Sequence, residues 1–182
     1  SGNLKRMLQP RAAKPPPEAF AHGAAGDAAR AEFGRAYTEM MKREWFYIGI
    51  HLGYRYEGSP LIIPDGTPAP PDEVMEYTPT ARPGHRAPHA WLADGRSTLD
   101  LFGRGFMLLR LGANPPDAAA LIAAARAANL PLQMVDIADP AIAELYENRL
   151  VLIRPDGHVA WRADPPPPDP SHLIATISGA AS

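Results

Sequence analysis

The sequence has 182 residues, of which 46% are hydrophobic and 21% are charged, so it is long enough for one globular domain with an appendage. Its 18 Lys and Arg residues and 20 Asp and Glu residues give a net charge of −2, which argues against nucleic acid and membrane surfaces as partners. Cysteine is absent, which excludes disulfides, thiolate nucleophiles and cysteine-ligated zinc.

The sequence also lacks the apolar segments that direct a protein to or through a membrane. It has no run of 18 apolar residues, and its N-terminus has no signal-peptide core. We therefore expect a cytoplasmic protein. The 22 prolines and the abrupt Ser1-Gly2 start keep open that the sequence is a fragment of a longer protein.

Residues 1–79 are predicted to be an N-terminal extension. A short basic amphipathic start leads into a proline-rich linker, which ends near residue 24. Apolar residues at spacings of three and four predict an amphipathic helix over 27–45, whose apolar face must pack on this chain or on another domain. Short aromatic and branched runs in 46–66 predict short strands, and 67–80 is a proline-rich connector.

Residues 80–182 are predicted to form one α/β domain. Asp94-Gly95 suits the turn of a hairpin near its start. The expected strands are 106–112, 131–139, 149–155 and 158–163. Three helices are expected: one that is capped by 114–117 and ends near Asn129, one that begins at Pro140, and one over 171–181 with Ser171 as N-cap. The order β-α-β-α-β-β-α, with a parallel βαβ half and an antiparallel hairpin, is the thioredoxin topology.

A redox-active thioredoxin carries its dithiol where the first strand meets the first helix, because the helix N-terminus lowers the thiol pKa. Here that junction reads LGANPPDA (111–118) and contains no cysteine. The loop before the third strand, Glu147-Asn148-Arg149, also lacks the proline of redox thioredoxins. We therefore predict a redox-inactive domain, with no catalytic, cofactor-binding or metal-binding residue in this chain.

The stretch ARPGHRAPHAWL (81–92) places His85 and His89 four residues apart, as a metal site would. Pro83 and Pro88 oppose a helix there, and in an extended chain the two histidines lie about 13 Å apart, too far for one zinc ion. We expect His85, Arg86 and His89 instead to bind neighbouring backbone. The other histidines are scattered and are interpreted as surface or core residues: His22, His51, His158 and His172.

Most carboxylates have structural explanations. Asp65, Asp94 and Asp156 each precede a glycine and are predicted to form turns. Asp100 is a candidate member of a catalytic pair, but no second member is evident. The connector contains three acidic residues that are expected to be solvated: Asp72, Glu73 and Glu76.

Glycines, arginines and aromatic residues point to no ligand site. The stretch GRGF (103–106) precedes a strand, the wrong side for a dinucleotide-binding loop. Four arginines are expected to pair with nearby acids rather than to form an anion patch: Arg82, Arg86, Arg96 and Arg104. Trp91, Phe102 and Phe106 are predicted to fill the core.

Three stretches carry a family resemblance: LGYRYEGSPLI (52–62), YTPTARPGHRAPHAWLADGRSTLDLFGRGFMLL (77–109) and LVLIRPDGHVAWRA (150–163). Together they cover about a third of the chain. They resemble the C-terminal region of FAD-dependent aromatic-ring hydroxylases of the phenol hydroxylase, dichlorophenol monooxygenase and aromatic polyketide hydroxylase type.

The resemblance implies a parent enzyme with a flavin-binding domain, a middle domain and a C-terminal thioredoxin-like domain without a dithiol. The parent reaction would use FAD, NAD(P)H and O2 to hydroxylate a phenolic or polycyclic aromatic substrate. The family's flavin fingerprint is absent here, so the implied role of this chain is packing against the flavin-binding domains and forming a homodimer. The alternative is a free-standing, redox-inactive thioredoxin-fold interaction module, which a GxGxxG motif upstream would exclude.

Overall fold

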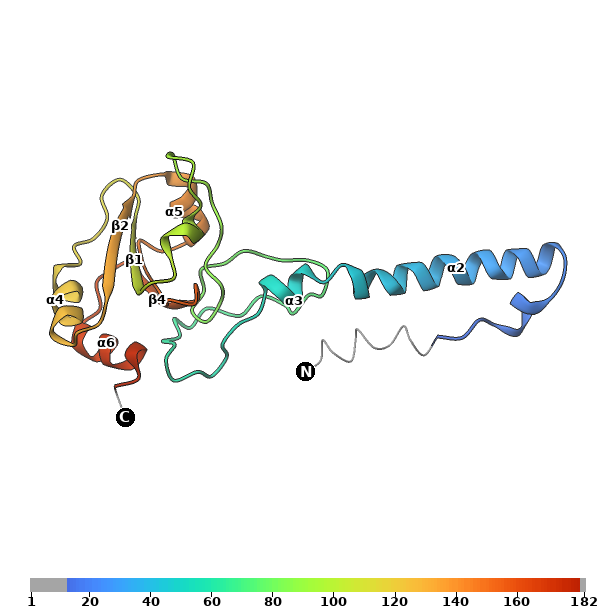
Figure 1. Ribbon diagram of the computed structural model, residues 1–182, viewed down its shortest axis with the longest axis horizontal. Coiled ribbons are helices and arrows are strands. Elements are labelled where there is room, and N and C mark those ends of the chain that lie inside the picture. Colours follow the sequence, from blue (N-terminus) through green and yellow to red (C-terminus); the bar gives the residue numbers. More distant parts are fainter. Residues whose placement is uncertain (1–12, 181–182) are drawn as a thin grey trace. The chain divides into compact units, whose positions relative to one another are not determined.

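The computed structural model describes residues 13–180, which fall into two compact units (Figure 1). The helical unit comprises the chain up to Gly53 together with Pro71–Tyr77, and the sheet unit comprises Tyr54–Pro70 and the chain from Thr78. The basic amphipathic start predicted for the first residues lies outside the described part. The predicted domain boundary at residue 80 stays a prediction.

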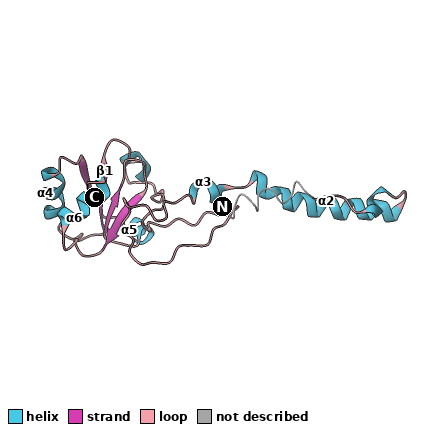
Figure 2. Ribbon diagram, turned by 90° about the horizontal axis from the view of Figure 1, so that it is seen from below, coloured by secondary structure: helices cyan, strands magenta, loops and turns pink. Residues whose placement is uncertain are grey.

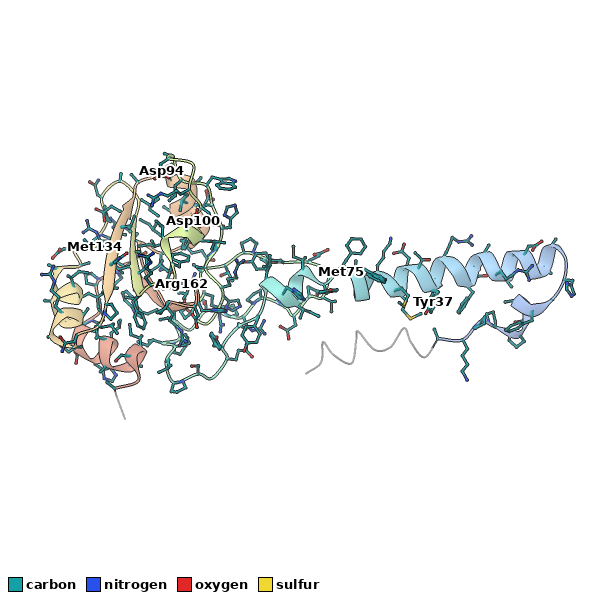
Figure 3. The ribbon with its side chains drawn as sticks, viewed as in Figure 1. Tyr37, Met75, Asp94, Asp100, Met134 and Arg162 are labelled. Carbon is teal, nitrogen blue, oxygen red and sulfur yellow. The ribbon has the colours of Figure 1, made fainter. Side chains whose placement is uncertain are left out.

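The helical unit contains η2 (Pro17–Phe20), α2 (Ala24–Trp45) and α3 (Ile48–Leu52). The long helix α2 confirms the helix predicted from residue 27, and it begins three residues earlier. Arg30 ties η2 to the first turns of α2, because its guanidinium donates to the Ala19 carbonyl at 2.8 Å. Within the described residues, a stripe of α2 is half-buried, and its members are Ala29, Phe33, Tyr37, Met40 and Met41 (Tyr37 is labelled in Figure 3).

The short strands predicted within 46–66 are wrong. Ile48–Leu52 is helical, and the part after it contributes only an isolated bridge between Arg55 and His85. The cause is tertiary: the Gly49 N–H donates to the Val74 carbonyl at 3.1 Å, so the 71–77 connector docks on the helix. A Cβ at Gly49 would lie 2.2 Å from the Glu73 carbonyl oxygen, so only glycine permits this approach. Such packing overrides the β-propensity of isoleucine and tyrosine.

The sheet unit confirms the predicted topology. Its elements are η3 (Thr98–Leu101), β1 (Phe106–Leu111), α4 (Ala119–Ala127), β2 (Leu132–Ile137), α5 (Pro140–Tyr146), β3 (Leu150–Ile153), β4 (Val159–Ala163) and α6 (Pro170–Ser178). The strand order is β2-β1-β3-β4, with β1 and β2 parallel and the other two pairs antiparallel. Helices cover both faces of this mixed sheet, as expected for alternating elements (Figure 2).

Each face of the sheet buries its own apolar cluster. On one face, Leu108 and Leu152 pack with residues of α4 and α6 such as Leu121 and Ile174. On the other face, Leu109 packs with Ile142 and Tyr146 of α5 and with the lead-in 81–87. Because successive strand residues point to opposite faces and both faces are covered, the buried residues of β1 and β3 are all apolar, and the one charged residue of β1, Arg110, is only half-buried.

Two irregular segments lie along the outer edge of β4. The Val159 N–H donates to the His85 carbonyl at 2.9 Å, and the Ile63 N–H donates to the Ala160 carbonyl at 2.9 Å. The segments 54–70 and 84–87 therefore satisfy backbone groups that an open strand edge would expose. This edge cover places the family-specific stretches against the sheet.

The ends of several elements differ from the predictions. The α6 helix is capped by Asp169, whose carboxylate accepts from the His172 N–H at 2.9 Å, and not by Ser171, because Pro170 occupies the first helical turn. The α4 helix begins at Ala119, later than predicted, with Asp117 accepting from its N–H at 3.1 Å. The Asp94-Gly95 turn closes a minimal hairpin with one bridge, Trp91 to Ser97. Within residues 13–180, no helix combines the length and apolar character needed to span a bilayer.

Candidate functional site

The strand–helix junction that holds the dithiol in redox thioredoxins is here a loop fixed by an arginine. Arg110 donates to both carboxylate oxygens of Asp136 at 2.7 and 2.6 Å, and to the Pro116 carbonyl at 3.2 Å. The guanidinium of Arg110 lowers the pKa of Asp136 through these hydrogen bonds. With no cysteine in the sequence, this junction joins β1, β2 and the start of α4 and offers no thiol chemistry.

The loop before β3 contributes a carboxylate in place of a proline. Glu147 ends α5 in the left-handed conformation, with φ of 67°. This backbone turns the Glu147 side chain toward the sheet unit's polar centre, where its carboxylate accepts from Thr80 at 3.0 Å and from Arg162 at 2.8 Å.

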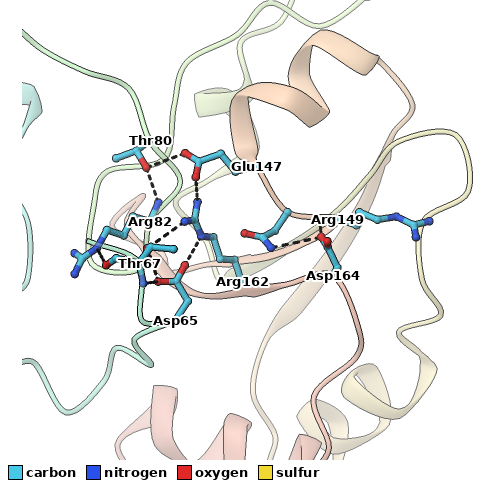
Figure 4. A network of polar contacts seen from close by, with 9 residues as sticks. Asp65, Thr67, Thr80, Arg82, Glu147, Arg149, Arg162 and Asp164 are labelled. Carbon is cyan, nitrogen blue, oxygen red and sulfur yellow. Dashed lines mark hydrogen bonds and ion pairs between the residues drawn. The ribbon is translucent and has the colours of Figure 1, made fainter. Parts of the chain in front are cut away.

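Arg162 is the centre of a polar network that joins remote segments of the sheet unit (Figure 4). It extends from β4 and is only 3% exposed. Its Nε donates to Asp65 at 2.6 Å, one terminal nitrogen donates to Glu147, and the other lies 3.3 Å from the Thr67 hydroxyl. Because a buried guanidinium is stable only when paired, Arg162 holds the segment around Asp65 and the α5–β3 corner against β4.

The carboxylate of Asp65 is fully engaged in this network. One oxygen accepts from the backbone N–H and the hydroxyl of Thr67, and the other accepts from Arg162. Burial alone would raise the pKa of Asp65, but the hydrogen bonds from Thr67 and Arg162 outweigh it and lower that pKa. Asp65 is therefore an ionised structural acceptor rather than a general base.

The other turn and capping carboxylates are engaged in the same way. The backbone N–H groups of Arg96 and His158 each donate at 3.1 Å to the aspartate two residues earlier, Asp94 and Asp156 respectively, which confirms the predicted turns. Asp100, the candidate member of a catalytic pair, closes a capping box on η3 by accepting from the Ser97 N–H at 2.8 Å, which gives it a structural explanation.

The stretch 81–92 is tied to the fold mainly through its backbone. His85 and Arg86 bridge to the backbone of Arg55 and His158 respectively, as expected for these two residues. The Pro88 carbonyl accepts from the hydroxyls of Thr98 and Tyr146, the latter at 2.6 Å. His89 Nδ1 instead lies 2.8 Å from the Ser97 hydroxyl. The ring nitrogens of His85 are buried and have no hydrogen-bond partner among the described residues.

No described group of three or more His, Asp or Glu side chains is arranged to hold a metal ion. The two histidines of the lead-in belong to different surroundings, since His89 lies on Trp91 with ring centroids 4.8 Å apart, whereas His85 is enclosed near β4. Trp91 is 69% exposed, so its predicted place in the core is wrong, while Phe102 and Phe106 pack against the two apolar clusters as predicted.

Sequence reasoning missed an aromatic and charged cluster beside the edge cover. The rings of Tyr56 and His158 lie 4.7 Å apart, and the guanidinium of Arg154 lies 5.1 Å from the centre of the Tyr56 ring. Asp156 pairs with Arg154 at 2.8 Å, and its negative charge is the main cause of a raised pKa at Tyr56. The only sequence signal was the YRY triplet, whose partners lie about one hundred residues later.

Comparison with known proteins decides the family. Residues 80–181, more than half of the chain, match the family described as "Aromatic-ring hydroxylase, C-terminal". The chain belongs to this family of C-terminal domains. The sequence-based expectation of a thioredoxin-like hydroxylase domain is therefore confirmed.

Curated relatives of this hydroxylase domain are named as monooxygenases or hydroxylases. The chain is 40% identical to the tetracenomycin B2 monooxygenase-dioxygenase of Streptomyces olivaceus, with 69% of this chain and 25% of that protein aligned. It is 38% identical to the FAD-dependent monooxygenase apdD of Emericella nidulans, over 64% of this chain and 20% of that protein. It is 36% identical to the 2,4-dichlorophenol 6-monooxygenase of Delftia acidovorans, over 63% of this chain and 22% of that protein.

Solved structures extend the similarity to nearly the whole chain. A structure of RebC, the rebeccamycin biosynthetic enzyme, with reduced flavin matches at 40% identity and a TM-score of 0.80, covering 98% of this chain and 32% of RebC. The flavin-dependent monooxygenase PieE, in complex with FAD and substrate, matches at 31% identity and a TM-score of 0.65, covering 97% of this chain and 34% of PieE. This chain thus spans about a third of the length of these solved enzymes and about a quarter of the length of the curated relatives.

Proposed function

We propose that this chain is the non-catalytic C-terminal region of an FAD-dependent monooxygenase that hydroxylates a phenolic or polycyclic aromatic substrate with NAD(P)H and O2. The observation that carries the proposal is the family match over residues 80–181. The relatives named above support the reaction class, because they include flavin-dependent monooxygenases and a dichlorophenol monooxygenase. Flavin, held elsewhere in the parent protein, would supply the oxygen chemistry.

The described residues of this chain do not fit a flavin dinucleotide. A dinucleotide site needs backbone N–H groups at a glycine-rich strand–helix turn. The β1–α4 junction has Pro115 and Pro116 at that place, which have no N–H to donate, and its α4 N-cap residue, Ala118, makes no side-chain cap. The charged groups at the centre of the sheet unit are engaged with one another. These observations support a structural role for the chain.

The helical unit has apolar surface for the flavin-binding domains of the parent. A hollow of about 570 Å³ is lined by Trp45, Phe46, Tyr47 and Met75, among others. Trp45 is 75% exposed and Phe46 is 59% exposed. Exposed aromatic residues clustered in this way favour a packing partner. We assign this surface to the flavin-binding domains and the half-buried stripe of α2 to a second copy, so that the parent forms a homodimer.

The test is to isolate the native protein with an antibody raised against residues 80–182 and to measure its intact mass and flavin content. The proposal predicts a polypeptide several times longer than this chain that carries one FAD per copy. A native polypeptide of about the 19.6 kDa of this chain, free of flavin, would contradict it and favour a free-standing interaction module.

A further inference from the structure

The edge cover of the sheet unit contains a concave surface with an excess of positive charge. A hollow of about 350 Å³ lies among Arg55, Tyr56, Glu57, Ser59, Pro64 and Arg82. Its volume falls in the range of small-molecule sites. It lies away from the β1–α4 junction and borders the Arg162 network at Arg82, whose Nε donates to the Thr67 carbonyl (Figure 4). The ion pairs of that network involve Arg162 and not Arg82, so they do not account for the hollow.

Two arginines and one glutamate supply the formal charges of the hollow. Arg55 donates to Glu57 at 2.7 Å, so the Glu57 charge is already matched. Arg96 pairs with Asp94, as was expected for all four arginines in this part of the sequence. Arg82, in contrast, forms no ion pair within residues 13–180. A half-buried guanidinium without a carboxylate is unusual, because such groups are normally paired.

The hydrogen bonding of Arg82 leaves its two terminal guanidinium nitrogens available to a ligand. Its Nε donates to the Thr67 carbonyl at 2.8 Å, which fixes the plane of the guanidinium (Figure 4). Figure 4 also shows the two terminal nitrogens turned away from Arg162. A pre-oriented pair of terminal N–H groups matches the paired oxygens of a carboxylate or phosphate.

His85 is buried close in sequence to Arg82 and Pro83 of the hollow. His85 is 5% exposed, and burial is the first cause of its lowered pKa. The charges of Arg82 and Arg55 lower the pKa further, while the carbonyls of Pro83 and Arg82 oppose the shift. An anion bound at Arg82 would therefore offset the positive charge that acts on His85.

We propose that this hollow binds a small oxyanion, a carboxylate or phosphate group, through the terminal guanidinium nitrogens of Arg82. Arg55 contributes long-range attraction, and Ser59 supplies a hydroxyl at the rim. The proposal does not rest on the monooxygenase role, because its evidence is the contacts and charges within the sheet unit. Its ligand is either a free phosphate or a free carboxylate, which share this chemistry.

The test is a titration of the full 182-residue chain, labelled with 15N, with inorganic phosphate, acetate and chloride at constant ionic strength. We expect saturable amide shifts at Arg82, Tyr56 and Ser59 with a dissociation constant of roughly 1–10 mM for the preferred oxyanion. The phosphate and acetate arms identify which oxyanion is bound. Chloride should give no saturable shift. Equal, non-saturating shifts with all three anions would overturn the proposal.

Matched variants locate the site. R82M should weaken oxyanion binding about tenfold, whereas R104M, which removes the same charge from an exposed bend outside the hollow, should leave it unchanged. An equal loss in both variants would show general charge attraction and would overturn the assignment.

A measurement on the unaltered chain covers the case in which R82M fails to fold. Bound oxyanion should raise the pKa of the His85 imidazole in an NMR titration, because its negative charge offsets the positive charges of the arginines that act on His85. An unmoved His85 titration at saturating phosphate and acetate would contradict the site.

Discussion

Arg162 and Asp65 are 97 residues apart in the sequence, yet Arg162 Nε lies 2.6 Å from Asp65 Oδ2. The side chain of Arg162 is 2% exposed and that of Asp65 is 16% exposed, so this ion pair is nearly removed from water. It joins the segment 54–70 to β4 and thereby keeps the family-specific stretches on the edge of the sheet.

Removing the carboxylate of Asp65 should destabilise the sheet unit strongly. In D65N, Arg162 keeps a buried charge with one partner fewer, and breaking such a pair costs about 3 kcal/mol. The measurement is urea unfolding followed by circular dichroism. The control is R96Q, which breaks an exposed pair and should change the free energy of unfolding by no more than about 0.5 kcal/mol. Equal effects of the two substitutions would show that the Arg162 network is not a stabilising centre.

Stability should fall as the pH is lowered from 7 to 5. His85 has a lowered pKa in the folded protein and binds a proton more readily when unfolded, with a usual pKa of about 6.5. Its contribution is therefore complete above pH 6.5 and is lost below it, by up to about 1.4 kcal/mol per pH unit. H85Q should flatten the dependence measured by urea unfolding at several pH values, while H172Q, at an exposed position, should retain it.

A second, more acidic loss of stability should come from the aspartates. The folded-state pKa values of Asp65 and Asp156 are lowered, so their stabilisation is present above an unfolded pKa of about 3.9 and disappears as the pH falls further. In the same unfolding series, D65N should remove part of the loss below pH 4. A profile of D65N that parallels the unaltered protein down to pH 2 would show that Asp65 does not titrate with folding.

Gly84 should tolerate no side chain. Its φ is 90°, and a Cβ there would lie 2.9 Å from the Tyr56 carbonyl oxygen. G84A therefore adds a backbone clash to the conformational strain of about 1–2 kcal/mol. Gly95 is the matched control, because its φ is 82° but a Cβ would meet no atom within 4 Å. Thermal unfolding of G84A should occur well below that of G95A, and equal midpoints would contradict the close approach of the two segments.

The stripe on α2 should mediate self-association. Phe33 and Tyr37 stack at 5.6 Å between ring centroids and remain half-buried within the described residues. F33E together with Y37E should shift a dimer to monomer in sedimentation equilibrium, because the apolar contact is replaced by two charges. R35E, on the exposed side of the same helix, should leave the dimer intact. A chain that is monomeric before any substitution would refute the proposed homodimer.

The fold of the sheet unit was accessible from the sequence because its elements alternate regularly. Short, largely apolar runs such as FMLLRL and LVLI, bounded by turn residues, favour buried strands, and the Asp156-Gly157 turn indicates the final hairpin. The helical character of Ile48–Leu52 was not accessible, because it depends on the docking of the 71–77 connector at Gly49.

The polar centre could not be predicted for a similar reason. Nothing local distinguishes Arg162 from a surface arginine at an alternating position of β4, since its partners Asp65 and Glu147 come from remote segments. Asp65 was correctly assigned to a turn, but the turn and the ion pair use different oxygens of one carboxylate. Local sequence patterns predict the turn at Asp65 but not its ion pair with Arg162.

The central claim is that this chain supplies structure and not flavin chemistry. The most direct measurement is equilibrium dialysis of the purified 182-residue chain against FAD, followed by visible absorbance of the retained flavin. The account predicts no saturable FAD binding and no FAD-dependent oxidation of NAD(P)H by the chain. Retention of one FAD per chain, with NAD(P)H oxidation, would contradict it.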